Sequence, residues 1–452
     1  MNGEHPLELA ERVLALAEGE AQVTVVHERS LVSRFARSRA TQATMVDTRT
    51  VEVLCVRDGH TGAASSERTD DEALRAAVSS AAAAAQASAR SGPGSYPGLP
   101  EPAPARAHEG HDPVTARLDP ATAGGALEAA FAAAAGANLE AFGIWSAGAV
   151  ETAIASSAGV RATDAVTDAF AKVICRDGDG RSGFASDTAV RAADIDVAAV
   201  ARRAAERVPR GELADVAPGE YPVVLEAEAV GVLLEFLGWL GFNGLAHAEG
   251  RGALSGRLGR RVAAPAVNLS DSPRFAHTLP RAFDAEGVPK APLPLIQDGV
   301  AHRVVHDTAS AAVAGGSAVS TGHALAAGGT PDGPVPAHLV LIGGGAADEH
   351  ELAAPVERGL YVTRLWYVNP VRERDALLTG MTRDGTYLIE DGRITRPVRD
   401  VRFTDGVLRL LEATEALGAR QRLVSEGEFY GRRSATGVVC PPLRAGGFRV
   451  NA

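Results

Sequence analysis

The chain has 452 residues, of which 46% are hydrophobic and 22% are charged, a balance typical of a globular protein and not of a disordered or fibrous one. At about 150 residues per domain, this length predicts two or three domains. Lys and Arg total 45 against 56 Asp and Glu, and the formal charge of −11 excludes nucleic-acid binding as the expected main function.

The three cysteines, Cys55, Cys175 and Cys440, are odd in number and far apart, so no disulfide framework is expected and a reducing cytoplasm fits best. The first twenty residues lack a basic segment and a cleavage site, and they predict an amphipathic helix instead of a signal peptide. The most apolar stretch is interrupted by Glu235 and Asn243, so no membrane span is expected.

The pattern along the chain predicts an α+β fold with an N-terminal α/β domain over 1–215. Short β-branched runs from 22 to 67 predict an antiparallel meander, and the Ala-rich segment that ends near 90 predicts a helix. Residues 92–105 are rich in Pro and Gly and should form an exposed connector. A second helix, several strand-like pieces and a third helix follow up to about 208.

The second half of this domain repeats the order of the first. Gly62–Ser65 and Gly183–Ser186 have similar sequences, and each closes a predicted meander just before a helix. The match suggests a duplicated domain, although a single tetrapeptide leaves an unrepeated domain open.

Residues 216–452 are predicted to form a β-rich C-terminal domain that is opened by one helix near Ala229–Leu240. Asp-Gly pairs at 298, 384, 391 and 405 predict tight hairpin turns. The strand candidates are 265–272, 338–343, 359–368, 385–392 and 398–406.

No catalytic set is evident from residue spacing alone. The His-Glu pairs at 27, 108 and 350 lack a second histidine four or five positions on, which a metallopeptidase helix needs. His247-Ala248-Glu249 is similar to part of the zinc deaminase motif, but no Pro-Cys-x-x-Cys segment completes it. No Gly-x-Ser-x-Gly or Ser-x-x-Lys motif is present. We therefore expect neither catalytic residues nor metal ligands on this chain.

A series of segments in the second domain resembles the TldD/PmbA family, also called the modulator of DNA gyrase family. The segments are GALSGRLGRRVAAP, AFDAEGVPKAPLPLIQDGVAHRVVHDTASA, STGHA at Ser320–Ala324, ERGLYVTRL and GTYLIEDGRITRPV. The family has a TldD branch with His-Glu-x-x-x-His on the helix that opens the second domain, and a TldE/PmbA branch that lacks this motif.

The resemblance places Glu235 and Leu240 at the two histidine positions and Phe236 at the general-base position. Leucine has no lone pair for a metal, and phenylalanine cannot accept a proton, so the helix should not bind the family's zinc. Cys440 occupies a place comparable to a cysteine ligand of the TldD branch, but a single thiol binds zinc poorly.

The resemblance therefore implies a non-catalytic TldE/PmbA-like subunit of a cytoplasmic heterodimer or higher complex. A TldD-like metallopeptidase partner would hold the zinc and hydrolyse small unfolded peptides or peptide-like metabolites, which strand edges could bind. Asn243, His247 and Arg251 are the candidates for the wall of the substrate cavity, with solvated loop positions as the alternative.

Two other classes of function remain open from the sequence. An autonomous metallohydrolase could use relocated ligands, namely His247 with Cys440 and either His302 or His306. A regulatory binding protein is suggested only by the family's association with gyrase modulation, and the acidic charge argues against direct contact with DNA.

Overall fold

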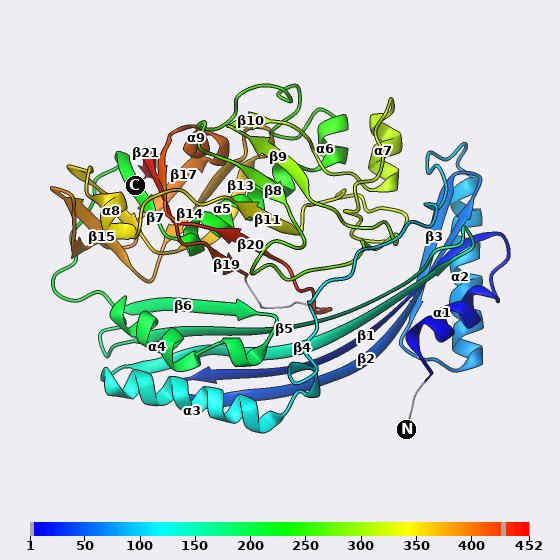
Figure 1. Ribbon diagram of the computed structural model, residues 1–452, viewed down its shortest axis with the longest axis horizontal. Coiled ribbons are helices and arrows are strands. Elements are labelled where there is room, and N and C mark those ends of the chain that lie inside the picture. Colours follow the sequence, from blue (N-terminus) through cyan, green and yellow to red (C-terminus); the bar gives the residue numbers. More distant parts are fainter. Residues whose placement is uncertain (1–3, 426–430, 452) are drawn as a thin grey trace.

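A six-stranded antiparallel sheet forms the N-terminal lobe of the computed structural model, which describes residues 4–425 and 431–451 (Figure 1). The strand order is β3-β2-β1-β4-β5-β6, and four of the strands are 16 to 19 residues long. The bounds are β1 Glu20–Ala36, β2 Arg39–Arg57, β3 His60–Ser66, β4 Glu140–Ser156, β5 Arg161–Arg176 and β6 Ser182–Ala189.

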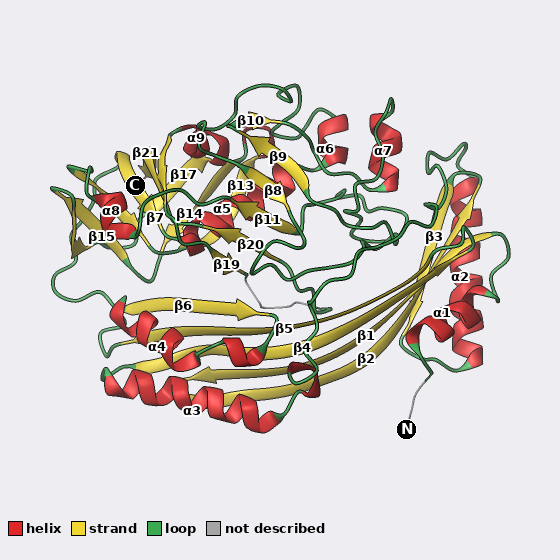
Figure 2. Cartoon of the chain, viewed as in Figure 1, coloured by secondary structure: helices red, strands yellow, loops and turns green. Residues whose placement is uncertain are grey.

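Two pairs of helices cover one face of this sheet (Figure 2). Val23 and Leu31 on β1 are an even number of residues apart and share that face, but Val23 packs against the first helix pair and Leu31 against the second. The opposite face is turned toward the C-terminal lobe (Figure 1). The helices are α1 Pro6–Leu14, α2 Asp71–Ala89, α3 Pro120–Gly136 and α4 Val197–Glu206, with 3-10 turns at Thr115–Arg117 and Ala192–Asp194.

The two halves of the sheet share one arrangement, a helix followed by three strands and a helix, and β1 pairs with β4 at the centre. Gly62 and Gly183 occupy equivalent places in it. A Cβ atom on Gly62 would run into the backbone of α2, and one on Gly183 would run into the backbone of α4. Both halves thus need a glycine where the third strand meets the following helix, which explains the tetrapeptide match.

The separate strand pieces predicted between 144 and 187 are three continuous strands, β4, β5 and β6. The prediction fragmented them because long stretches of β4 and β5 are buried on both faces and are rich in Ala, Gly and Ser. Such strands lack the alternation of polar and apolar residues that marks a half-buried strand.

Residues 92–105 form neither helix nor strand, as expected, but they are not exposed throughout. Tyr96 is buried, and its hydroxyl lies 3.4 Å from Glu286 Oε1 in the C-terminal lobe. The connector therefore packs against the second lobe through Tyr96. The high Pro and Gly content of the segment did not indicate that this side chain is buried.

The C-terminal lobe consists of two mixed sheets with α5 (Ala227–Leu240) between them. The helix predicted near Ala229–Leu240 is confirmed as α5, and its apolar side chains lie at the centre of the largest core. The first sheet has the order β10-β9-β8-β11-β20-β19; the second has β13-β14-β17-β21-β7-β12-β15-β16, with β18 paired to β21.

The remaining bounds complete the lobe. The strands are β7 Gly219–Leu225, β8 Leu269–Asp271, β9 Leu293–Gln297, β10 Val300–Ala301, β11 His338–Leu341, β12 Arg358–Val362, β13 Leu365–Arg372, β14 Leu377–Thr382, β15 Thr386–Glu390, β16 Arg393–Pro397, β17 Arg402–Gly406, β18 Thr414–Leu417, β19 Arg422–Val424, β20 Gly437–Cys440 and β21 Leu443–Asn451. The helices are α6 Gly244–Ala248, α7 Thr308–Ala314, α8 Glu349–Ala353 and α9 Val407–Glu412, with a 3-10 turn at Glu373–Asp375.

Two of the four hairpins predicted from Asp-Gly pairs are present. Asp298 and Asp391 begin the two-residue turns of β9-β10 and β15-β16, and both have positive φ angles. The other two predictions are wrong. Asp384 is buried and bonds Arg364 before β15, and Asp405 lies inside β17, where it binds Arg409. In both cases an ion pair, and not a turn, uses the carboxylate.

No helix within the described parts of the chain is long and apolar enough to cross a membrane.

Candidate functional site

The helix α5 occupies the place where the resemblance puts a metal-binding helix. It begins directly after β7, with Glu226 as its N-cap, and ends where Gly241 follows Leu240. Most of its side chains are buried because sheets lie on both sides of it. The buried side chains of this helix are therefore held in place by the packing on both sides.

The three positions that matter for metal chemistry carry unsuitable side chains. Glu235 is exposed, Phe236 packs at the border of the core, and Leu240 is buried. The rings of Phe236 and Trp239 lie 6.3 Å apart, so this stretch of the helix presents an aromatic surface. One carboxylate remains where the family's motif has two imidazoles and a general base, and it cannot hold zinc alone.

Asn243 caps the short helix α6 and is fully buried. Its Oδ1 atom accepts a hydrogen bond from the backbone N–H of Ala246 at 3.0 Å, and its Nδ2 group donates to the carbonyl of Asp332 at 2.5 Å. Both ends of the amide are thus used to fix the loop after α5. A role for Asn243 in a substrate cavity stays a prediction.

His247 lies on α6 and is partly buried, and burial lowers the pKa of its imidazole. Its Nδ1 atom is buried and has no hydrogen-bond partner among the residues that the structure describes. Gly244 packs directly against the ring of His306, which brings the start of α6 onto this second imidazole. The structure therefore brings His247 and His306 into one neighbourhood, as the relocated-ligand hypothesis requires.

Arg251 forms ion pairs with two glutamates. Its Nε atom lies 2.6 Å from Glu249 Oε2, and its Nη1 atom lies 3.5 Å from Glu373 Oε2. These are partly exposed ion pairs, which contribute little to stability. The prediction that Arg251 lines a cavity is not tested by these contacts.

Cys440 lies at the opposite end of α5 from His247. Its Sγ atom donates to the carbonyl of Ala227, the first residue of the helix, at 3.3 Å. The helix has 14 residues, so about 20 Å separate its two ends. Burial is the main cause that raises the pKa of the Cys440 thiol, which keeps it protonated. Across residues 4–425 and 431–451, no three His, Cys, Asp or Glu side chains are grouped to hold a metal.

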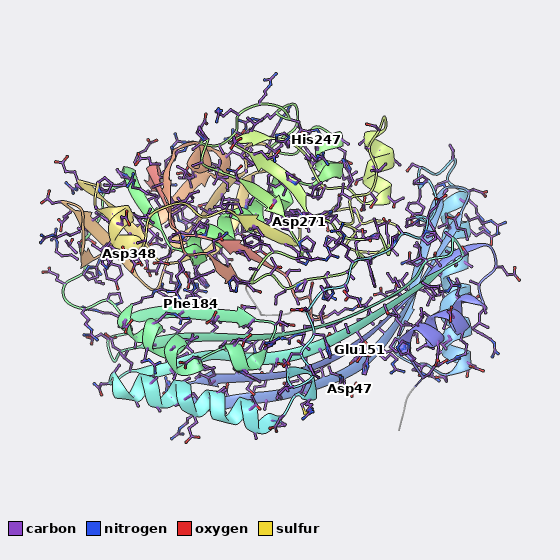
Figure 3. The ribbon with its side chains drawn as sticks, in the orientation of Figure 1. Asp47, Glu151, Phe184, His247, Asp271 and Asp348 are labelled. Atoms are coloured by element: carbon purple, nitrogen blue, oxygen red, sulfur yellow. The ribbon has the colours of Figure 1, made fainter. Side chains whose placement is uncertain are left out.

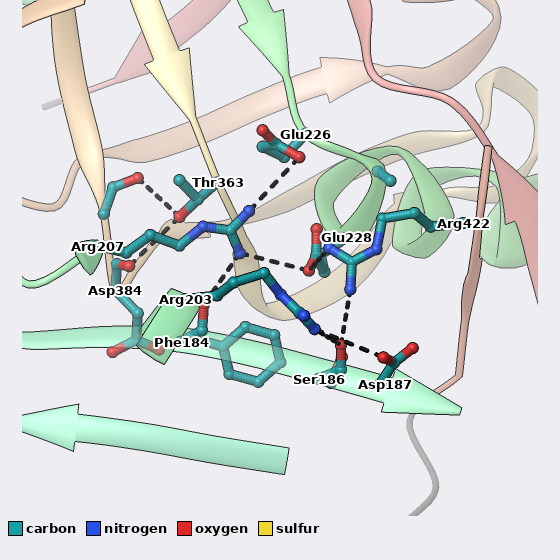
Figure 4. Close-up of polar contacts among 12 residues, drawn as sticks. Phe184, Ser186, Asp187, Arg203, Arg207, Glu226, Glu228, Thr363, Asp384 and Arg422 are labelled. Carbon is teal, nitrogen blue, oxygen red and sulfur yellow. Dashed lines mark hydrogen bonds and ion pairs between the residues drawn. The ribbon is translucent and has the colours of Figure 1, made fainter. Parts of the chain in front are cut away.

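A buried network of charges, which the sequence did not reveal, surrounds the start of α5 (Figure 4). Glu228 Oε1 lies 3.0 Å from Arg422 Nη1 and 3.4 Å from Arg207 Nη1, and Glu226 Oε2 lies 3.6 Å from Arg207 Nη2. Arg207 follows α4 in the N-terminal lobe, so the network joins the two lobes. The sequence gives one indication of this network. Two glutamates stand at the start of an apolar helix, where buried carboxylates need cationic partners.

The two glutamates of this network differ in charge preference. Burial raises the pKa of Glu226, which shares a hydrogen bond of 2.6 Å with the Tyr361 hydroxyl. Burial also opposes the ionisation of Glu228, but Arg207 and Arg422 outweigh it, and the pKa of Glu228 is lowered. Glu228 is therefore the anion that holds the two arginines together.

Two cavities lie where the lobes meet. One of about 720 Å³ is bordered by the end of β6, by His108 and by the segment from Arg274 to Pro280. One of about 370 Å³ lies between the β2-β3 turn, Tyr96, Leu245 and α7. Asn243, His247 and Arg251 line neither of them. Leu245 does, so α6 contributes to the smaller cavity through a different residue from those predicted.

Family models match most of the chain. The model of the PmbA/TldA metallopeptidase central domain matches residues 117–210, and that of the PmbA/TldA metallopeptidase C-terminal domain matches 218–452.

Two curated relatives are each 26% identical to this chain. A metalloprotease of Methanothermobacter thermautotrophicus matches over 239 residues, and a metalloprotease TldD homolog of Haemophilus influenzae matches over 257. The matches cover 50% and 57% of this chain and 49% of each relative, so the chain aligns with about half the length of these relatives.

The crystal structure of TldE from Thermococcus kodakarensis has the same fold. It superimposes with a TM-score of 0.85 over 98% of this chain and 99% of that one, at 19% identity.

Proposed function

Because the chain belongs to the PmbA/TldD metallopeptidase family, we propose that it is the TldE/PmbA-like subunit of a heteromeric peptidase and does not itself hold the catalytic metal. The observation that carries this proposal is the composition of α5. Glu235, Phe236 and Leu240 stand where the motif of the TldD branch would supply two imidazoles and a base, and the leucine is buried in the core.

The partner in this proposal is a TldD-like metallopeptidase subunit that binds zinc and cleaves the substrate. The substrates are small unfolded peptides or peptide-like metabolites, and the complex works in the cytoplasm. In support, both polar and apolar residues line the cavities between the lobes, and the cavity volumes fall in the range of small-molecule sites.

Relocated zinc ligands fit the side chains of this chain poorly. His247 and His306 come together, but Cys440 lies at the far end of α5, and its thiol remains protonated because it is buried. His302 directly follows β10 and is exposed. An imidazole pair alone lacks the third protein ligand of a catalytic zinc site.

The zinc content of the purified chain, expressed without a partner and dialysed against a mild chelator, tests the proposal. We expect far less than one zinc per chain and no chelator-sensitive peptidase activity. Co-expression with a TldD-like protein should give a stoichiometric complex with about one zinc per pair. One tightly held zinc on the isolated chain, or cleavage by it alone, would overturn the proposal.

A further inference from the structure

The two edges of the N-terminal sheet are treated differently. At β6, the backbone carbonyl of Ser186 accepts a hydrogen bond from Arg422 Nη2 at 2.8 Å, and that of Phe184 accepts one from Arg207 Nη1 at 3.0 Å (Figure 4). These carbonyls lie on the side of β6 that faces away from β5. A further strand would pair with the sheet on that side. Guanidinium groups therefore close this edge, as native proteins commonly do for exposed edges.

The opposite edge is open along the larger part of β2, on the side of the hairpin to β1. The last strand, β3, pairs only with residues 51–57, so residues 39–50 have β1 on one side and no strand on the other within the described chain. Arg57 and His60 close a two-residue hairpin and form a hydrogen-bonded pair. Counting back from Arg57, every second residue of β2 directs its N–H and C=O groups to the side on which β3 lies. The outward groups of the open segment therefore belong to Ala43, Met45, Asp47 and Arg49.

This open segment lacks the usual protection of an edge strand. Between Arg39 and Asp47 the sequence ATQATMV contains no charge and no proline, and the bulge opposite Arg34 lies at the hairpin end only. Met45, in the middle of the segment, is 62% exposed. Asp47 lies on the edge opposite to Phe184 (Figure 3). An edge strand with an uncharged and exposed apolar centre is a template for pairing with another strand.

We propose that a second copy of this chain pairs with this edge, antiparallel and across a two-fold axis at Met45. In this register Met45 lies opposite the same residue of the second copy, and Ala43 lies opposite Asp47, so all three use their outward N–H and C=O groups. A two-fold axis makes the contact isologous and closes it as a dimer. The two six-stranded sheets then become one continuous sheet.

The charges of the segment disfavour the register that is shifted by two residues toward β3. With the axis at Met45, Asp47 faces Ala43 and Arg49 faces Thr41, so no like charges are opposed. An axis two residues further on would place Asp47 opposite its own copy, and like charges directly opposite are unfavourable. The free segment is also nearly symmetric about Met45, so this register uses its whole length.

The inference concerns the isolated chain and does not depend on the proposed function. Sedimentation of the full chain at micromolar concentration should give twice the monomer mass of 46.6 kDa. Two variants test the edge. Met45→Pro removes an outward N–H and leaves the bonds to β1 in place, as edge strands tolerate. Met45→Arg keeps the backbone and opposes two cations at the axis. Both should sediment as monomers with native circular dichroism.

Val319→Arg serves as the matched control because Val319 is also an exposed apolar residue, on the other lobe. This variant should remain a dimer. Hydrogen exchange supplies a second readout: the amides of Ala43, Met45 and Asp47 should exchange slowly in the wild-type dimer and fast in Met45→Arg. A monomeric wild-type chain at 100 μM, on the order of a weak dimer's Kd, would overturn the proposal. So would dimers of both Met45 variants, or an edge that pairs only with a TldD-like partner.

Discussion

Arg433 and Asp168 form a two-point ion pair deep between the lobes, with Nε 2.7 Å from Oδ1 and Nη2 2.6 Å from Oδ2. Asp168 lies on β5, and Arg433 belongs to the C-terminal lobe, so the pair ties that lobe to the face of the N-terminal sheet. Gly148 on β4 makes room for the guanidinium, since a Cβ atom there would overlap it. The backbone N–H of Arg433 also donates to Glu28 at 2.8 Å.

Asp168→Ala should destabilise the protein strongly because it leaves a buried guanidinium without its carboxylate. Loss of one partner of such a pair costs about 3–5 kcal/mol. Asp215→Ala is the matched control, since Asp215 pairs with Arg399 on the surface. That variant should lose less than about 1 kcal/mol. Urea unfolding measures the free energy of unfolding of both variants. Equal decreases would show that the buried pair stabilises the protein no more than the surface pair does.

Glu286 should make the stability depend on pH. Burial is the main cause that raises its pKa from an ordinary value of 4.5 to about 7, and Asp284 adds to it. Between these values the folded state holds a proton that the unfolded chain has released, so the free energy of unfolding falls as pH rises through this window. Glu286→Gln can still accept from Thr308. It should gain on the order of 2–3 kcal/mol at pH 8 and flatten the profile between pH 5 and 7.

The measurement is a set of urea unfolding curves from pH 5 to 8. Glu101→Gln is the control, because Glu101 is exposed on the connector and its replacement should leave the profile unchanged. An unchanged slope in Glu286→Gln would contradict the assignment of the proton to this carboxyl.

Cys440→Ser should leave the activity of the proposed complex within about twofold of wild type, since the serine hydroxyl can donate to the Ala227 carbonyl as the thiol does. Cys175→Ser is a close match, because that buried thiol donates to the carbonyl of Ala201 at 3.4 Å. Peptidase activity and zinc content are measured for both. If only Cys440→Ser abolished activity and lost zinc, Cys440 would be a ligand and the relocated-metal hypothesis would gain support.

Asn243→Ala should destabilise the loop after α5 by about 1–2 kcal/mol, because it removes the cap of α6 and a donor to Asp332. Asn243→Asp retains the acceptor of the cap but sets a buried carboxylate against the Asp332 carbonyl, so it should lose at least as much. Thermal unfolding separates the two variants, and peptidase assays of the complex test the predicted cavity role. A loss of activity in Asn243→Asp with little change in stability would favour contact with substrate.

Sequence patterns predicted the elements whose signals are local. The helix α2 contains the Ala-rich run that predicted it, and it begins after Asp70, whose side chain caps it. The helix α5 was found because a long apolar run between turn residues has few other interpretations. The hairpins at Asp298 and Asp391 followed from turn chemistry that depends on two residues only.

The interactions between distant parts of the chain could not be predicted in this way. Arg207 and Glu228 are separated by a whole strand and loop, and Arg433 meets Asp168 from 265 positions away in sequence. Charged residues usually lie on the surface, so their types gave no sign of burial. The candidates Asn243 and Arg251 were chosen for polarity next to α5, and the structure shows one of them as a helix cap and the other in surface ion pairs.

The length of the central strands also affects how the N-terminal lobe unfolds. β1 and β4 each run 17 residues, a span of about 55–60 Å, and both helix pairs are laid along them. If one helix pair unfolds, it exposes part of strands that also pack against the other helix pair. The two small cores are therefore thermodynamically coupled through shared strands, and this lobe should lose its structure in a single cooperative step despite its duplicated plan.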